Sequence, residues 1–557
     1  MSCTVEWLSS SRTTEGLPSG ASVAGSVRGL EVPVEIRCVG MNSRMCRNAQ
    51  RTFCGCCQFH LDPYVGWRGK AGYQVRAHIR HRRRGGVIVL HGRVVSRCAN
   101  SAAGCFGPLT TPPSRWASTI RAVATGGGEP VVGVPINAGN WQLPPFNRWA
   151  YWHVKDILPT QPIPRGSGPV RELPPATGQS EVTEIHLTRR DGSFATVGEV
   201  LAETYTDAYV VLQHGELIAE WYGTEGAPER THALMSVSKS VVGCVAAALV
   251  DRELLDADGP ITEYVPELAT SGYVGATVRH VLDMRSGVRF REEYTDPDAE
   301  LRELGQWIGW APTYQGELPR GVYQYLTGLQ AEAPHGQRFL YRSAETDVLG
   351  WVCERAAGKK MRELISELIW QPMGAEFDAE ILCDGTGTAV HDGGLCAAAR
   401  DVARFGQMVL DGGSVPDQRS ETRAVIGPGW LRQAWAVDAD ARTVFAASPA
   451  EVSMPGGWYR NQFWFRPGLH SDVLLCLGIH GQMVHISRRT RTVCVKLSSW
   501  PQPQNPDFMQ DTLRAFDAVG GALTGRRSSG DRHRLPGIVA GVSRHGAADR
   551  SGLSDDG

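Results

Sequence analysis

The chain has 557 residues and a mass of 60.6 kDa, which exceeds the roughly 100 to 200 residues of an ordinary domain, so we expect one large domain with appendages or two domains. Its charge is balanced, with 57 Lys and Arg against 58 Asp and Glu, and 42% of its residues are hydrophobic. This composition excludes a chain that is disordered throughout or bound to nucleic acid by overall charge. No run approaches the roughly 20 apolar residues that span a bilayer, and the first residues lack a secretory signal, so we expect a soluble, cytoplasmic protein without membrane contact.

Residues 1–129 differ in composition from the rest. Up to residue 125, 17 Lys and Arg stand against five acidic residues, and eight of the 14 cysteines fall there. Three interpretations compete: a zinc module on Cys46, Cys54, Cys56 and Cys57, a basic arm for nucleic acid around HIRHRRRGG, or an upstream reading frame joined by a wrongly placed start. We favour the third, because paired CxxC knuckles are missing and GC-rich DNA gives Arg-rich, Lys-poor sequence in an unselected frame. The prediction is a non-homologous Arg- and Cys-rich extension over 1–129, either disordered or the product of a wrongly placed start, with no nucleic-acid partner.

The folded domain is expected over residues 130–525. Its first segment, WQLPPFNRWAYWH at 141–153, suggests a wrapped arm, and the Pro and Gly content of 159–180 indicates a loop. The pattern AYVVLQHGELIAEWYG at 208–223 predicts two strands around a His-Gly turn. The next segment, SKSVVGCVAAALVDREL, is apolar at almost every position and predicts a buried helix.

Alternating β-branched segments return between residues 471 and 500, in SDVLLCLGIHG, QMVHIS and TVCVKLSSW. A sheet that combines strands from both ends of the domain follows from this pattern. Residues 526–557 are polar and Gly-rich and are predicted to form a disordered tail.

The chemistry concentrates at Ser236 and Lys239. If Ser236 opens the buried helix, these two side chains stand on one face about one turn apart, so the amine can act on the hydroxyl. A lysine partly desolvated there is expected to have its pKa lowered, which would let it take the proton of the serine nucleophile. The helix start also offers the backbone N–H of Ser236 to an oxyanion. Alone, S-x-x-K is a weak motif, and an ordinary helix cap with a solvated lysine is the favoured interpretation of it.

The context favours catalysis. An S-x-x-K between a hairpin and an apolar helix is typical of the penicillin-binding and serine β-lactamase type of site, which also needs a Tyr or Ser loop and an edge-strand motif. Tyr341 and Ser343, in YRS, resemble that loop, where a tyrosine shuttles the proton, although spacing alone favours a core aromatic for Tyr341. The segment LGIHGQ at 477–482 stands where the edge-strand motif belongs. We interpret His480 within it as structural and assign it no catalytic role.

Several longer motifs resemble the 6-aminohexanoate-dimer hydrolase family, a β-lactamase-fold group that cleaves amides of nylon oligomers and carboxylic esters. The resemblance covers about two thirds of the chain, from Trp141 to about Val519, but neither the first 130 residues nor the tail. Its motifs are MSVSKS, TEYVPELA, VLDM, EEYTDP, ETDVLGWVCERAAG, HDGGLCAAARDVARFGQMVLDGG, GIHGQ and VKLSSWP. The resemblance implies an α/β (α+β) serine β-lactamase or penicillin-binding-protein-like fold: an antiparallel sheet flanked by helices, plus a helical domain.

The resemblance also implies roles for individual residues. Ser236 would be the acylated nucleophile, Lys239 its proton acceptor and Tyr341 the acid that serves the leaving group. The backbone N–H groups of Ser236 and Ile479 would form the oxyanion hole. The substrate-binding residues are expected to be Tyr294, Trp310, Ser343 and Asp392, with Tyr294 closing over the substrate and Trp310 forming the wall beside it, although both could simply pack a loop.

One position departs from the family. Efficient dimer hydrolases can carry an acidic residue eleven positions after the loop tyrosine, where it meets the substrate's ammonium group, and this chain has Gly305 there. A buried ammonium without a partner is costly, so cleavage of the amide dimer is not expected unless Asp392 supplies a carboxylate.

The predicted function is therefore that of a serine hydrolase acting on a small-molecule ester or linear amide through an acyl-enzyme on Ser236, without a metal or cofactor. The alternatives are a β-lactamase or D-amino-acid peptidase of the same fold, a penicillin-recognising protein that is acylated without turnover, and last a nucleic-acid binder. The sequence leaves a homodimer open.

Overall fold

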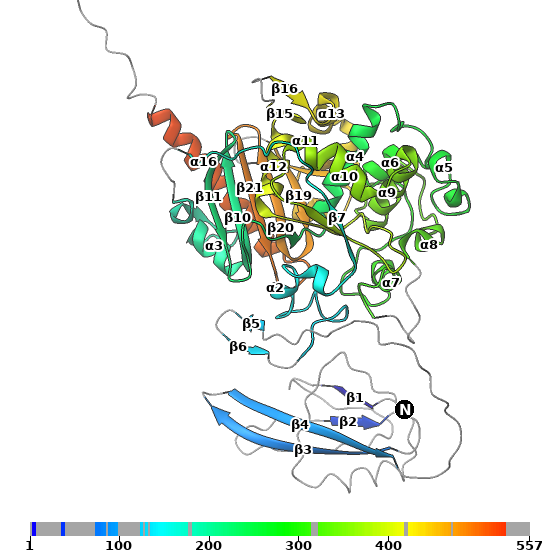
Figure 1. The fold of residues 1–557 in the computed structure, drawn as a ribbon, viewed down its shortest axis with the longest axis vertical. Coiled ribbons are helices and arrows are strands. Elements are labelled where there is room, and N and C mark those ends of the chain that lie inside the picture. Colours follow the sequence, from blue (N-terminus) through cyan, green and yellow to red (C-terminus); the bar gives the residue numbers. More distant parts are fainter. Residues whose placement is uncertain are drawn as a thin grey trace, which may run out of the picture. The chain divides into compact units, whose positions relative to one another are not determined.

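A computed structural model describes residues 134–524, apart from gaps at 177–180, 313–320, 417–420 and 469–471. Beyond this range it gives only the backbone of strands up to residue 131 and of the end of a C-terminal helix. The chain divides into two compact units, Met1–Arg115 and Trp116–Gly557. Figure 1 shows both units.

The first unit contains two antiparallel strand pairs: β1 (Cys3–Glu6) with β2 (Glu35–Cys38), and β3 (Tyr73–Arg84) with β4 (Val87–Cys98). These strands were not predicted from the sequence. The signal for β3 and β4 was a Gly-Gly pair before the β-branched segment VIVLHGRVVSRC, because Gly-Gly is typical of a hairpin connection. The cysteines of the zinc-module interpretation lie outside the described residues.

The second unit contains the predicted hairpin. Strands β10 (Thr206–Gln213) and β11 (Glu216–Tyr222) pair antiparallel. Both residues of the connecting turn have positive φ, 52° at His214 and 83° at Gly215, as a two-residue turn between twisted strands requires. The His-Gly prediction is confirmed.

These strands belong to a seven-stranded antiparallel sheet in the order β11-β10-β21-β20-β19-β18-β17. The strands from the C-terminal part are β17 (Trp458–Arg460), β18 (Phe463–Pro467), β19 (Asp472–Gly478), β20 (Gln482–Ser487) and β21 (Thr492–Ser498). Strand β10 pairs with β21, so the sheet joins both ends of the domain, as predicted (Figure 1).

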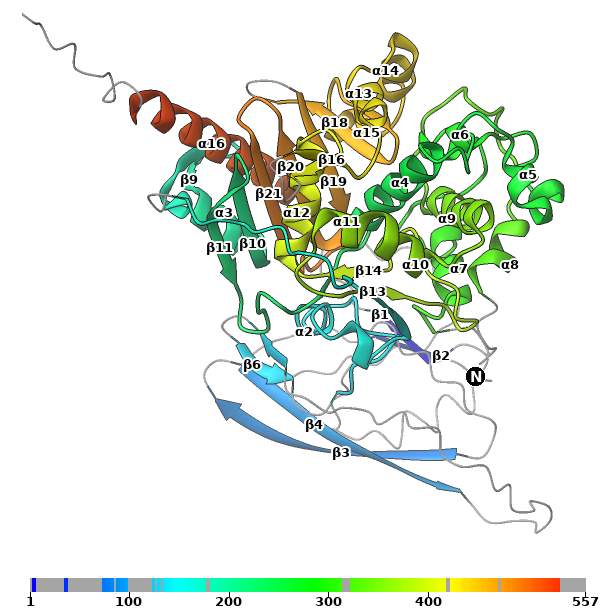
Figure 2. The same cartoon turned by 45° about the horizontal axis from the view of Figure 1, so that its top comes forward.

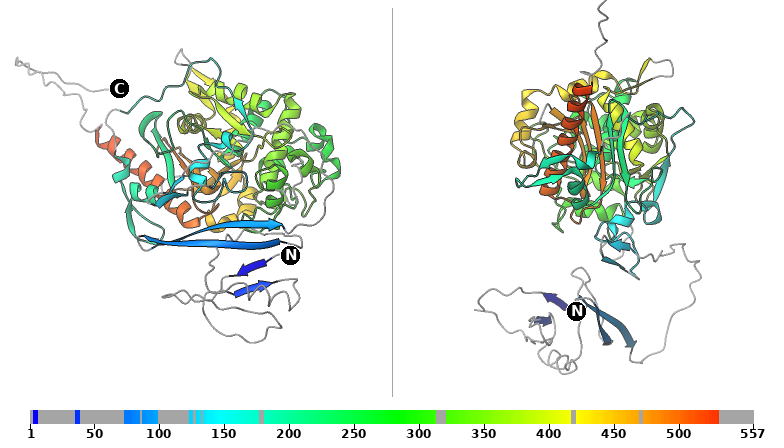
Figure 3. Two further views of the ribbon diagram at one scale, coloured as in Figure 1. Left: turned by 60° about the horizontal axis from the view of Figure 1, so that its bottom comes forward. Right: turned by 90° about the vertical axis from the view of Figure 1, so that its left-hand side faces the viewer.

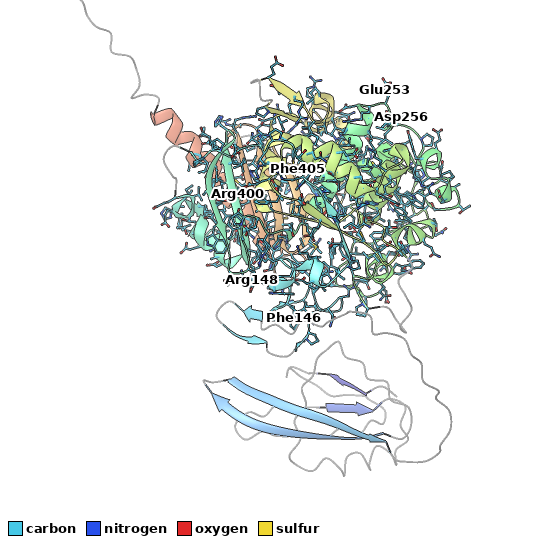
Figure 4. The ribbon with its side chains drawn as sticks, in the orientation of Figure 1. Phe146, Arg148, Glu253, Asp256, Arg400 and Phe405 are labelled. Carbon is cyan, nitrogen blue, oxygen red and sulfur yellow. The ribbon has the colours of Figure 1, made fainter. Side chains whose placement is uncertain are left out.

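Alternating side chains of the sheet enter two hydrophobic cores. From β10, Val210 packs with α4 (Val237–Val250) and α12 (Ala399–Leu410), whereas Val211 packs with α3 (Val197–Glu203) and α16 (Pro506–Gly530). Figure 3 shows α16 along one face of the strands. In Figure 4 Phe405 and Arg400 mark α12 on the other face, where Phe405 is buried and the Arg400 Nε lies 2.8 Å from Oε2 of Glu220 in β11.

Helices beside the sheet form the expected helical region (Figure 2). They are α5 (Ile261–Tyr264), α6 (Val278–Leu282), α7 (Glu300–Trp307), α8 (Val322–Thr327), α9 (Ser343–Ala357), α10 (Met361–Ile365), a π-helical turn (Ser366–Trp370) and α11 (Gln371–Met373). The predicted apolar helix is α4, which is buried along almost its whole length and packs on both α9 and β19. The first turn of α4 therefore lies at the boundary between the sheet and the helices.

A smaller antiparallel sheet has the order β12-β14-β13-β7, with β12 (His232–Ala233), β14 (Leu395–Ala397), β13 (Ala379–Leu382) and β7 (Thr160–Ile163). Strand β7 lies in the segment 159–180 that we expected to be a loop. The Pro and Gly content misled this prediction, because a proline such as Pro162 is tolerated on an edge strand.

The remaining α-helices and strands are short. They are β5 (Val123–Thr125), β6 (Gly128–Val131), α2 (Asn147–Ala150), β8 (His186–Thr188), β9 (Phe194–Thr196), β15 (Ser414–Pro416), β16 (Thr422–Ala424), α13 (Pro428–Trp435), α14 (Ala439–Ala446) and α15 (Ala450–Ser453). Helix α16 continues to Gly530, past the domain end predicted at residue 525. Among the described residues, no helix has both the length and the apolar character needed to span a bilayer.

Candidate active site

The turn that enters α4 presents Ser236. Met235, just before it, has φ of 47°, a left-handed conformation that a long side chain rarely adopts. Its carbonyl accepts the backbone N–H of Ser238 at 3.0 Å and the Ser238 hydroxyl at 2.6 Å, which stabilises the turn. Ser236 caps the helix and is half-buried. The nucleophile candidate is thus fixed on a rigid element and remains accessible.

Lys239 is 1% exposed and lies between three polar groups. Its Nζ is 3.0 Å from the Ser236 Oγ, 3.0 Å from the Ser343 Oγ and 2.8 Å from the carbonyl oxygen of Asp392. The Asp392 Oδ2 lies 3.4 Å away. The predicted spacing of Ser236 and Lys239 therefore produces a direct amine to hydroxyl contact.

The charge of Lys239 differs from our expectation. Burial acts to lower its pKa, but the negative charges that Tyr341, Asp392, Glu292 and Asp347 carry when ionised outweigh burial and hold the pKa above its usual value. The expected lowering considered only burial. In the resting enzyme Lys239 is a cation, and it must lose a proton before it can act as a base.

Tyr341 and Ser343 come from the loop that opens α9. The Tyr341 ring packs on Trp464 at 5.0 Å between centroids, and its centroid is 5.2 Å from the Lys239 Nζ. Burial raises the pKa of Tyr341, against the opposing effect of Lys239. Tyr341 is therefore a protonated phenol beside the lysine, as a group that donates a proton to a leaving group must be.

The loop is anchored by a buried ion pair. Arg342 and Glu345, both without solvent exposure, approach to 2.8 Å, and the Ser286 hydroxyl donates to the same Glu345 oxygen at 2.6 Å. Burial raises the pKa of Glu345 to about 7. This anchor fixes the backbone between Tyr341 and Ser343, so both side chains face Lys239.

Glu292 joins the loop of Tyr294 to Ser343. Its Oε1 accepts the hydroxyls of Tyr294 and Ser343, each at 2.7 Å, and its Oε2 accepts the backbone N–H of Ser343 at 2.8 Å. Burial raises the pKa of Glu292, with Lys239 acting in the opposite direction. The sequence analysis missed this residue, although its place two residues before the expected loop tyrosine was a usable signal.

Asp347 lies behind Asp392. Its Oδ1 accepts the backbone N–H groups of His391 at 2.9 Å and of Asp392 at 3.1 Å, which fixes the turn that carries the Asp392 side chain. Burial and the nearby Asp392 raise the pKa of Asp347 well above its usual value. The sequence analysis also missed Asp347, which stands four residues after Ser343 on the same face of α9.

The end of β19 lies against the turn before Ser236. A Cβ on Gly478 would be 2.7 Å from the Leu234 carbonyl oxygen and 3.1 Å from the Met235 Cβ, so only glycine allows this approach. Ile479 follows directly and is half-buried. The approach brings the two backbones of the predicted oxyanion hole together.

His480 has φ of 59°, and its Nδ1 lies 2.8 Å from the carbonyl oxygen of Trp500. Burial lowers the pKa of His480 to about 4, so the ring is neutral at pH 7. These contacts agree with a structural role.

Trp310 packs against the N-terminal arm and lies near Gly393. Its ring meets Trp141 in a T-shaped contact at 5.5 Å, and the Trp141 indole N–H donates to the Trp310 carbonyl at 3.2 Å. A Cβ on Gly393, the neighbour of Asp392, would be 3.5 Å from the Trp310 ring. The arm predicted at 141–153 thus packs against a predicted substrate-binding residue.

The site contains a candidate nucleophile, an amine, a phenol and two candidate backbone donors, and it lies between a sheet and a helical region. Within the described part of the chain, no group of three or more His, Cys, Asp or Glu side chains could hold a metal ion. This fold and site define a serine hydrolase of the β-lactamase type.

Comparisons with known proteins support the assignment to the β-lactamase type. The family described as Beta-lactamase matches residues 199–519. The chain is 37% identical over 399 residues to the 6-aminohexanoate-dimer hydrolase of Paenarthrobacter ureafaciens, a match that covers 70% of this chain and 95% of that protein. A putative 6-aminohexanoate-dimer hydrolase from Bacillus anthracis has a similar structure, with a TM-score of 0.60, 25% identity and coverage of 72% of this chain and 98% of the other.

A more distant relative is the esterase EstB of Burkholderia gladioli, 27% identical over 212 residues, which are 33% of this chain and half of that protein. The chain therefore belongs to the β-lactamase family and, within it, to the 6-aminohexanoate-dimer hydrolases. The resemblance inferred from the sequence motifs is confirmed.

Proposed function

We propose that the chain hydrolyses small carboxylic esters, and linear amides more slowly, through an acyl-enzyme on Ser236. The observation that carries this proposal is the 3.0 Å contact between the Ser236 Oγ and the Lys239 Nζ at the start of a buried helix. An isolated serine hydroxyl is a weak nucleophile, and an adjacent amine can remove its proton during attack.

In the proposed mechanism Ser236 attacks the substrate carbonyl while its proton moves to Lys239. The negative charge on the carbonyl oxygen is stabilised by the backbone N–H groups of Ser236 and Ile479. Tyr341 gives its proton to the leaving alcohol or amine, and water then resolves the acyl-enzyme with the proton transfers reversed.

The charge of the site favours esters. A linear amide with a free ammonium group needs a carboxylate partner once it is desolvated. Gly305 offers none, and the carboxylate of Asp392, which we expected to serve such a substrate, already lies 3.4 Å from the Lys239 Nζ. An uncharged acyl ester requires no such partner.

The test compares the full-length chain with its Ser236→Ala variant on a p-nitrophenyl short-chain ester and on 6-aminohexanoate dimer. Ester turnover that disappears in Ser236→Ala is the expected result, with slow or absent dimer cleavage. Equal ester turnover by both proteins would overturn the proposal. Mass spectrometry after treatment with a fluorophosphonate should place the modification on Ser236.

The same preparation distinguishes the alternatives of this fold. Faster turnover of cephalosporins or D-alanyl amides than of the ester would identify a β-lactamase or a peptidase. A stoichiometric release of p-nitrophenol without a steady state would identify an acylated binding protein.

A further inference from the structure

The resting site holds a protonated Lys239, yet the proposed mechanism needs a free amine. We propose that Glu292 receives the surplus proton of Lys239 through the hydroxyl of Ser343, so that Lys239 enters the acylation step as a neutral amine. This inference rests on the proposed function, and it adds a proton acceptor to the mechanism.

The hydrogen bonds run in the required direction. The Lys239 Nζ donates to the Ser343 Oγ at 3.0 Å, and the same hydroxyl donates to the Glu292 Oε1 at 2.7 Å. The backbone N–H of Ser343 donates to the other carboxylate oxygen of Glu292 at 2.8 Å, so two hydrogen bonds from Ser343 fix the Glu292 side chain. A donor, a hydroxyl relay and an acceptor are already aligned.

The other carboxyl groups near the lysine suit this task less well. The Asp392 Oδ2 is 3.4 Å from the Lys239 Nζ, a poor hydrogen-bond distance, and Asp392 holds Lys239 mainly through its backbone carbonyl. Asp347 has no exposed surface, and its Oδ1 already accepts two backbone N–H groups, those of His391 and Asp392. Glu292 and the neighbouring Tyr294 are both half-buried. Because Glu292 keeps some contact with solvent, its carboxyl group can exchange a proton with water.

The transfer balances in atoms and charge. One N–H bond of Lys239 breaks as an O–H bond forms on Ser343, while the original Ser343 O–H bond breaks and an O–H bond forms on Glu292. A cation and a carboxylate thus become a neutral amine and a neutral acid. Burial disfavours the charged forms of both end groups, which lowers the free-energy cost of forming the neutral pair inside the protein.

Each end of the relay faces a defined set of charged or titratable groups. Lys239 faces Tyr341, Asp392, Glu292 and Asp347. Glu292 faces Lys239, and it contacts Tyr294 and Ser343 by hydrogen bonds. A pH dependence of acylation must be interpreted with all of these groups, of which Glu292 is the one that loses its function when it is protonated before substrate binds.

The experiment measures the rate of p-nitrophenol release in the first turnover, from about pH 5 to about pH 10, for the full-length chain. The variants are Glu292→Gln, Ser343→Ala and, as the matched control, Glu293→Gln, which changes the exposed neighbouring carboxylate. Thermal unfolding checks that each variant folds.

We expect Glu292→Gln and Ser343→Ala each to lower the acylation rate about 100-fold at pH 7 and to move the rise of the rate to higher pH by more than about one unit. At high pH the lysine can lose its proton to solvent, so the rate should partly recover. Glu293→Gln should match the wild type. An equal loss at every pH, with the rise unmoved, would mean that Glu292 has only a structural role and would overturn the inference.

A second measurement does not depend on turnover. The infrared carbonyl band of a protonated carboxyl group, taken as the difference between wild type and Glu292→Gln, reports the titration of Glu292 in the resting protein. The inference requires Glu292 to be ionised at neutral pH, and a band already present there would refute it. Failure of the proposed function would instead appear as a wild type that neither releases p-nitrophenol nor is labelled by fluorophosphonate at Ser236.

Discussion

Gly478 lies so close to Leu234 that a Cβ on the glycine would be 2.7 Å from the leucine carbonyl oxygen. This approach joins β19, which leads into Ile479, to the backbone that leads into Ser236. Because Met235 already has a left-handed backbone, the turn has little freedom to move away. The spacing of the predicted oxyanion hole therefore depends on the absence of a side chain at residue 478.

We expect Gly478→Ala to lower the acylation rate about 100-fold, because displaced donors bind the developing oxyanion poorly. The control is Gly429→Ala, since Gly429 is exposed and its added Cβ would meet nothing within 4 Å. First-turnover rates of both variants on the p-nitrophenyl ester measure the effect. A fully active Gly478→Ala would show that the oxyanion lies elsewhere.

Gly305 offers a test of substrate choice. An added Cβ would meet only the Ala311 Cβ, at an ordinary 3.8 Å, so an aspartate fits without displacing the helix backbone. Gly305→Asp should raise the kcat/KM for 6-aminohexanoate dimer at least 10-fold, because the new carboxylate pairs with the substrate ammonium, and should leave the uncharged ester unaffected. The control is Gly305→Asn, because asparagine has the shape of aspartate without its charge. Equal gains in both variants would refute the electrostatic explanation.

Local sequence patterns predicted much of the fold and of the site. The His-Gly hairpin, the apolar helix α4 and the late strands each depend on neighbours in the chain, as does the contact of Ser236 with Lys239. The charge of Lys239 was predicted wrongly, because it depends on Asp392 and Glu292, which are far away in sequence and reach the lysine only in the folded domain. Strand β7 was missed for a similar reason: its pairing with β13 is a long-range contact that its Pro content hides.

Asp347 is expected to reduce stability at neutral pH. Its pKa is raised in the folded protein, so the folded state keeps a proton that the unfolded state releases, and the free energy of unfolding falls as pH rises above about 4. Asp347→Asn preserves the acceptor for the backbone N–H groups of His391 and Asp392 but cannot ionise. Urea unfolding at several pH values should show a more stable variant at pH 7 and convergence with the wild type near pH 4. An Asp347→Asn variant that is less stable than the wild type at pH 7 would contradict the raised pKa of Asp347.

Lys496 makes the free energy of unfolding depend on pH in the opposite direction. It is fully buried in β21, its Nζ donates to the Thr204 carbonyl at 2.9 Å, and burial lowers its pKa to about 7, with Asp207 opposing. Between pH 7 and the ordinary lysine pKa near 10, the unfolded state binds a proton that the folded state does not, so the free energy of unfolding rises with pH across this window.

Replacing Lys496 by methionine should remove that dependence. At about 1.4 kcal/mol per pKa unit, the wild type should gain about 4 kcal/mol between pH 7 and pH 10 relative to Lys496→Met. The Thr204 carbonyl stays satisfied in the variant, because the Trp500 indole N–H also donates to it at 2.9 Å. The matched control is Lys359→Met, which removes an exposed lysine from a surface ion pair with Glu367 and should follow the wild-type curve. Parallel curves for Lys496→Met and the wild type would show that Lys496 is charged in the folded protein at pH 7 and above.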